Sequence, residues 1–125
     1  MPIQTTIYHP DRLIIGRGTG ALTFQEFVDF GRRIEAEGLV HYRKILDVID
    51  ARPAFTEEEF ARMILLARAV KVDRKRGALA LVADPARGQF ARLFAAMDVD
   101  GRPARVFPSI HEARAWIAAN PPEGD

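Results

Sequence analysis

The sequence predicts a single α/β domain in which helices pack on a mixed, mostly parallel β-sheet. Its 125 residues fit one domain, because domains usually contain about 100–150 residues. A hydrophobic share of 48% is typical of a globular chain and too high for a disordered one. Short β-branched runs alternate with amphipathic segments of roughly a dozen residues, which is the pattern of right-handed crossovers between parallel strands.

The chain opens with a predicted antiparallel hairpin. Ile3, Thr5 and Ile7 alternate with polar neighbours, and after a Pro/Asp turn a second apolar run covers residues 13–15. The glycine-rich segment 16–20 follows, in a setting where backbone N–H groups can cradle phosphate. It lacks both the dinucleotide-binding spacing and the Walker lysine, so we expect it to end the strand through positive φ angles.

Three hydroxyl residues predict the starts of helices. Thr23, Thr56 and Ser109 are each followed three residues later by glutamate, which is the capping-box pattern. Apolar residues then recur at helical spacing, and Gly38 is expected to end the first of these helices. A further helix is predicted after Asp84, an N-cap residue followed by proline at the first helical position.

Three short apolar runs between the helices are expected to form strands covered on both faces, at 45–49, 78–82 and 104–107. The predicted order is therefore β-β-α-β-α-β-α-β-α, with the hairpin adding an antiparallel edge. We assign residues 1–119 to this domain and residues 120–125 to a frayed C-terminal tail.

This order resembles that of the SpoIIAA-like, STAS/SEC14-type group of small bacterial proteins. The motifs that carry the resemblance are GTGALT at 18–23, ILDV at 45–48, RVF at 105–107 and EARAWI at 112–117. The resemblance implies a STAS-like fold and a non-catalytic regulatory or protein-interaction role, as in anti-sigma-factor antagonists.

The phosphoswitch members of that family carry an Asp-Ser pair after the central strand, and a partner kinase phosphorylates the serine. The corresponding segment here, 50–56, contains no serine. Thr56 is the nearest hydroxyl, and we expect it to cap a helix, since a phosphate there would face three glutamates.

Ligands of open parallel sheets bind beyond the carboxyl ends of the strands. The residues predicted to form such a ligand or partner surface are Asp50, Arg52, Thr56, Asp84, Arg87 and Ser109. The arginines beside helix N-termini would favour a small anion or an acidic partner segment, although the two aspartates offset part of that potential.

Asp47 lies in an apolar strand, where burial without a partner would be costly, so it must be paired, hydrogen-bonded or near the exposed end of the strand. Asp47 and Asp50 are three residues apart and are expected to point to opposite faces of the sheet.

An alternative function is that of a small apolar-ligand or lipid carrier, which the likeness to SEC14-type proteins suggests. The residues that could line its pocket are Met63, Phe90, Phe94 and Trp116. Their periodicity also fits an ordinary hydrophobic core, which is the first interpretation of each.

Enzymatic activity is not expected. The chain has no cysteine, and His9, His41 and His111 stand in separate segments without metal-ligand spacing. We therefore predict no catalytic, cofactor or metal site, and a protein partner or a homodimer instead.

A formal net charge of +1 argues against nucleic-acid binding, and the basic run at 71–76 is expected to be a solvated helix end. No apolar run reaches 18 residues and no signal-peptide core is present, so we expect a cytoplasmic protein without membrane insertion.

Overall fold

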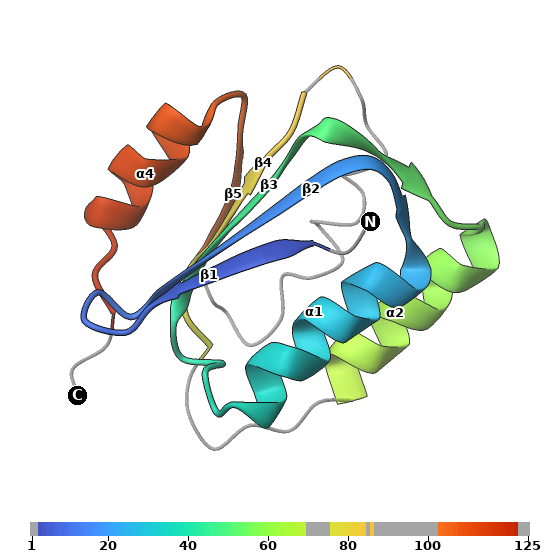
Figure 1. Ribbon diagram of the computed structural model, residues 1–125, viewed down its shortest axis with the longest axis horizontal. Helices are drawn as coiled ribbons and strands as arrows, with labels where there is room; N and C mark the ends of the chain where they lie inside the picture. The colour runs from blue at the N-terminus through green and yellow to red at the C-terminus, as the bar shows by residue number, and fades with distance from the viewer. Residues whose placement is uncertain (1–2, 70–75, 85, 87–102, 123–125) are drawn as a thin grey trace.

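The computed structural model describes residues 3–69, 76–84, 86 and 103–122. Its sheet has the strand order β1-β2-β3-β4-β5, in which β1 and β2 are antiparallel and all other neighbours are parallel (Figure 1). The elements are β1 (Gln4–Tyr8), β2 (Leu13–Thr23), α1 (Phe24–Ala36), β3 (Arg43–Ala54), α2 (Glu57–Ala69), β4 (Leu79–Val82), β5 (Ala104–Phe107) and α4 (Ile110–Ala118). The mixed α/β class is therefore confirmed. The helix predicted after Asp84 lies outside the described residues.

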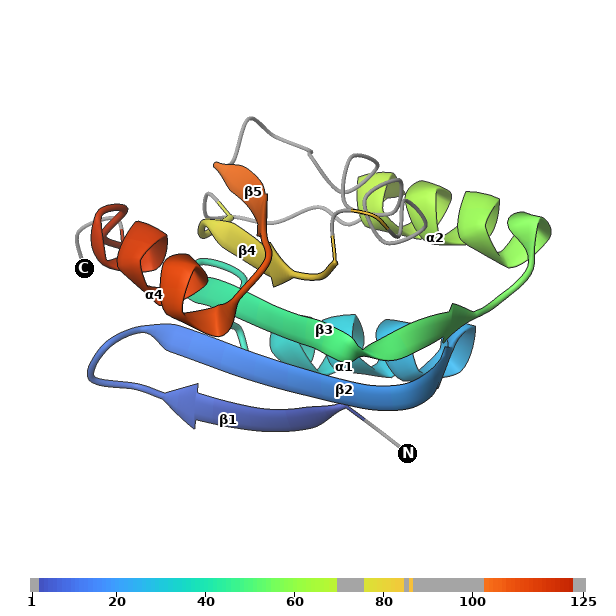
Figure 2. The same cartoon turned by 90° about the horizontal axis from the view of Figure 1, so that it is seen from above.

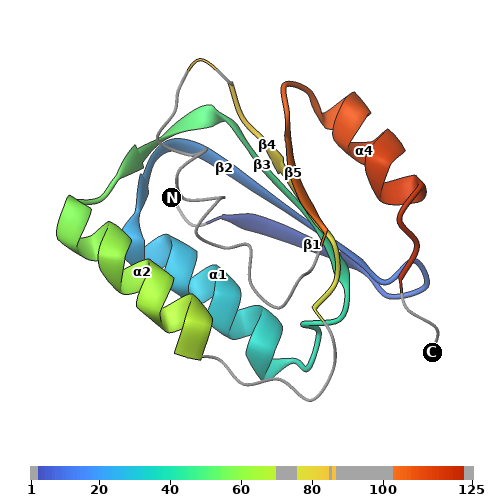
Figure 3. The ribbon, with the colours of Figure 1, turned by 180° about the vertical axis from the view of Figure 1, so that it is seen from behind.

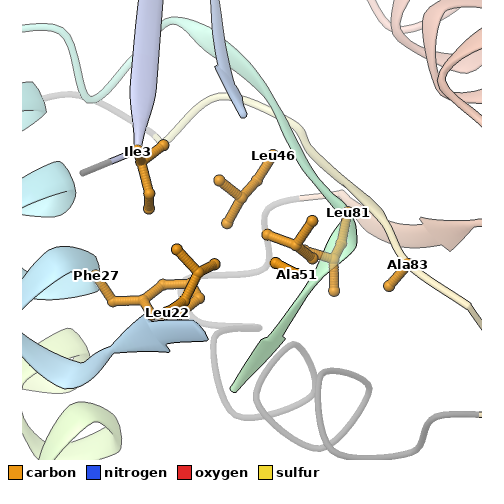
Figure 4. Close-up of a cluster of buried hydrophobic side chains, with 8 residues drawn as sticks. Ile3, Leu22, Phe27, Leu46, Ala51, Leu81 and Ala83 are labelled. Carbon is orange, nitrogen blue, oxygen red and sulfur yellow. The ribbon is translucent and has the colours of Figure 1, made fainter. Parts of the chain in front are cut away.

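Helices cover both faces of the sheet. Figures 1 and 3 show α1 and α2 side by side on one face and α4 on the other. On the α1/α2 side, Leu22 and Phe27 converge with Leu46 and Leu81 (Figure 4). The α4 side has its own cluster around the fully buried Ile45. Strand β3 lies at the centre and contributes alternate side chains to both layers.

The glycine-rich segment continues β2 instead of ending it, so the predicted strand exit at 16–20 is wrong. A Cβ on Gly16 would lie 2.8 Å from the Phe30 ring, and one on Gly18 would lie 2.7 Å from Leu22. Within this segment only Gly20 has a positive φ, at 67°. Two of the glycines therefore serve close packing of side chains on the strand, which the sequence pattern does not distinguish from a turn.

Strand β3 is also longer than predicted, because residues 50–54 are strand and not loop. The register shifts along it. Arg17 is opposite Asp47, whereas Thr19 is opposite Asp50, so β3 carries one extra residue in a β-bulge. The Asp47 carboxylate accepts a hydrogen bond from the Ile49 N–H at 3.2 Å within this bulge, which is one of the three alternatives expected for Asp47.

The three predicted caps are present. The hydroxyls of Thr23, Thr56 and Ser109 each accept a hydrogen bond from the backbone N–H of the glutamate three residues later, at 3.0–3.2 Å. At Thr56 the box is reciprocal, since its N–H donates to the Glu59 carboxylate at 2.9 Å. Gly38, with φ of 70°, follows the C-cap of α1 as predicted.

Arg43 fixes the end of α4 to the β1–β2 turn. Its guanidinium donates to the Ile117 carbonyl at 2.8 Å and to the Asp11 carbonyl at 2.7 Å. Burial lowers the pKa of Arg43, and the negative charge of Asp11 partly offsets that effect. These bonds attach the C-terminal end of α4 to the sheet.

Candidate functional site

The carboxyl halves of β2 and β3 extend beyond the rest of the sheet. Strand β1 pairs with β2 only along residues 13–17, and β4 pairs with β3 only along residues 44–47. In the part of the chain that the structure describes, the later residues of these two strands therefore pair only with each other. Figure 2 shows β2 and β3 continuing past the end of β4 toward α1 and α2.

The bulge in β3 brings two carboxylates to the same face. Directly opposed residues on neighbouring strands share a face, and Arg17 and Thr19 are two residues apart on β2. Their partners Asp47 and Asp50 therefore also share a face, and the expectation that they point in opposite directions is wrong. The face is the one that α4 covers elsewhere, because Ile45 precedes Asp47 by two residues and packs toward α4.

Several polar side chains on this face are exposed, and Asp47 is half-buried. The Arg17 guanidinium lies 3.3 Å from the Asp50 carboxylate, and the two side chains are 56% and 60% exposed. The next opposed pair, Ala21 and Arg52, is exposed as well. We call this surface the β2–β3 face, and its members are Arg17, Thr19, Ala21, Asp47, Asp50 and Arg52. With two arginines and two aspartates, its formal charge is balanced.

The structure separates the residues predicted to form one surface. Asp50 and Arg52 lie together on the β2–β3 face. Thr56 and Ser109 cap α2 and α4, which cover opposite faces of the sheet. Asp84 is exposed after β4, where its carboxylate accepts a hydrogen bond from the Ala86 N–H at 2.9 Å.

Arg87 lies outside the described residues. The expectation of a small anion or an acidic partner segment therefore stays a prediction. Arg52 shares its face with Arg17 and with two aspartates. Sequence reasoning missed Arg17 and Thr19, because both belong to the glycine-rich segment that we predicted to end the strand.

The four residues predicted to line an apolar pocket do not all meet. Met63 packs with the core on the α1/α2 side of the sheet. Trp116 packs on the α4 side, with its ring centroid 5.5 Å from that of Phe107. The sheet separates Met63 from Trp116, so the two cannot line one pocket. Phe90 and Phe94 lie outside the described residues.

Within residues 3–69, 76–84, 86 and 103–122, no group of three or more His, Cys, Asp or Glu side chains is placed to hold a metal ion. Of the helices described there, none is both long enough and apolar enough to cross a membrane. What the β2–β3 face offers is an exposed array of hydrogen-bond donors and acceptors of both charges, which suits polar recognition of another molecule.

Known proteins resemble this chain in structure and not in sequence. No family profile and no curated protein matches it. A solved structure that does match is an uncharacterized protein from the DUF3478 family with a SpoIIAA-like fold, from Shewanella loihica PV-4. The two share a TM-score of 0.61 at 13% identity, over 92% of this chain and 91% of the other. The chain therefore has a SpoIIAA-like, STAS-type α/β fold.

Proposed function

We propose that this protein is a non-catalytic regulatory domain of the cytoplasm that binds a protein partner through the β2–β3 face. The observation that carries the proposal is this face itself, formed by the two longest strands of the sheet. It presents the exposed Arg17–Asp50 ion pair next to the exposed Arg52.

The chemistry of the face fits a partner that binds and dissociates. Non-obligate interfaces are about as polar as the rest of a protein surface, unlike permanent ones. An exposed ion pair contributes only about 0–1 kcal/mol to stability, so the Arg17–Asp50 pair can rearrange toward a partner at little cost.

A serine phosphoswitch is not part of the proposal. The serine required by that mechanism is missing, and the nearest hydroxyl, that of Thr56, is engaged in the reciprocal cap of α2. Regulation would therefore not use a phosphorylated serine in segment 50–56.

Replacing each of two exposed alanines by arginine tests the proposal. Ala21 is exposed on the β2–β3 face, whereas Ala36 is exposed at the end of α1 on the other side of the molecule. Ala21→Arg adds bulk and a third positive charge beside Arg52, and Ala36→Arg makes the same change elsewhere. Proteins that co-purify with the tagged wild-type chain from host cells would be identified by mass spectrometry and their affinities measured.

We expect Ala21→Arg to weaken binding of the partner at least about tenfold, which corresponds to about 1.4 kcal/mol, and Ala36→Arg to leave it unchanged. Equal binding by all three proteins would show that the partner uses another surface. Absence of any specific partner would contradict the interaction role itself.

A further inference from the structure

The two edges of the sheet differ in how well they are protected. Exposed edge strands present unpaired N–H and C=O groups, and proteins usually blunt them with charges, prolines, bulges or very short strands. Strand β5 follows this rule, because it has four residues, follows Pro103 and carries the exposed Arg105. Strand β1 does not follow it.

Strand β1 has five residues, QTTIY, with no charge and no proline, and its register with β2 is unbroken. Threonine, isoleucine and tyrosine are strong strand formers. Gln4, Thr6 and Tyr8 are exposed, and Tyr8, at 41%, is one of the few exposed large hydrophobic residues in the described chain. No described strand pairs with the outer edge of β1.

The geometry points to a second copy of this chain as the occupant of that edge. We propose that two protomers pair antiparallel through β1, on a two-fold axis that passes between the two Thr6 residues. This register places Thr5 opposite the Ile7 of the second copy and Gln4 opposite its Tyr8. A two-fold antiparallel pairing is self-complementary, so an uncharged strand of this kind meets itself without opposing like charges.

The contact is small. The area buried by pairing five residues on each side falls below the roughly 1,000 Å² of a stable interface. The dimer should therefore exchange with monomer and form at high protein concentration. The edge adjoins the β2–β3 face only where Gln4 lies opposite Arg17, and the dimer can be tested without any other protein.

Substitutions at Thr6 test the proposal through charge. Thr6 is exposed on an edge strand, so Thr6→Lys and Thr6→Glu should both fold, and circular dichroism would verify this. Each variant alone places like charges at the two-fold axis. Mixing the two variants places opposite charges there. Ala115→Lys is the control, because it introduces the same side chain at an exposed position of α4, which belongs neither to the β1 edge nor to the β2–β3 face.

Sedimentation velocity from micromolar to millimolar concentration should show dimerisation of the wild type and of Ala115→Lys. It should show monomers for each Thr6 variant and restored association for their mixture. Amide exchange in residues 4–8 of the wild type should slow as concentration rises. A wild type that stays monomeric, or a dimer that Thr6→Lys leaves intact, would overturn the proposal. A monomeric wild type whose protein partner is lost in Thr6→Lys would assign the edge to that partner instead.

Discussion

Removing the Thr56 hydroxyl separates its role as a helix cap from a role as a phosphoacceptor. The hydroxyl accepts a hydrogen bond from the Glu59 N–H at 3.0 Å, and the carboxylate of Glu59 accepts one from the Thr56 N–H at 2.9 Å. In Thr56→Ala the first of these bonds is lost and one N–H at the start of α2 loses its side-chain partner. Such losses cost about 1 kcal/mol. For 125 residues, that cost corresponds to a fall in Tm of about 4 °C.

Differential scanning calorimetry of three variants measures this effect. Thr56→Ser keeps the hydroxyl and should melt near the wild type. Thr56→Asp mimics the charge of a phosphate but is also a good N-cap, so its Tm should stay close to the wild type, with some loss from the neighbouring glutamates. Neither Thr56→Ala nor Thr56→Asp should alter partner affinity. If Thr56→Asp abolishes binding while its Tm is unchanged, Thr56 is a regulatory position as well as a cap. A wild-type Tm for Thr56→Ala would refute the cap argument.

Substitutions at three further positions test how the site is supported. Gly16→Ala should destabilise the fold by about 1–3 kcal/mol, because the added Cβ would lie 2.8 Å from the Phe30 ring. Gly31 is exposed in α1, and a Cβ added there would have no atom within 4 Å. Gly31→Ala should therefore stabilise the fold by about 0.5–1 kcal/mol. Urea denaturation measures both, and equal effects would show that Gly16 has room for a side chain. Asp47→Ala should cost about 1 kcal/mol by removing the acceptor in the bulge, while Asp47→Asn, which keeps an oxygen, should cost less. If the two Asp47 variants are equally stable in the same assay, the hydrogen bond does not support the bulge.

Local chemistry explains what was predictable from the sequence. A capping box is contained in four residues, so Thr23, Thr56 and Ser109 could be recognised without knowing the fold. Gly38 was predictable for the same reason, because a helix end that needs positive φ favours glycine locally.

The errors arose where a residue's role depends on distant parts of the chain. Gly16 is required because Phe30 of α1 packs against it, and nothing near Gly16 in the sequence indicates that contact. The bulge near Ile49 depends on the pairing of β3 with β2. A shift of one residue reverses which face each later side chain occupies, and this is why the position of Asp50 was predicted incorrectly.

The bulge also determines what the surface can recognise. Without it, Asp50 would point toward the α1/α2 layer, where a carboxylate beside Leu46 and Val48 would require a partner. With it, the carboxylate faces solvent and pairs with Arg17, while Ala51 takes the buried position on the α1/α2 side. The extra residue therefore keeps the core apolar and places the charge on the β2–β3 face.

The proposed dimer would add valency to this face. A two-fold axis that relates antiparallel edge strands is perpendicular to the sheet, so the same face of both protomers would point in one direction. Two β2–β3 faces would then lie on one side of a continuous sheet. A partner with two binding sites would gain avidity from this arrangement without any new contact, because its second binding event becomes intramolecular. Weak association through β1 and weak recognition through the β2–β3 face would then reinforce each other, so that partner binding rises steeply with the concentration of the protein.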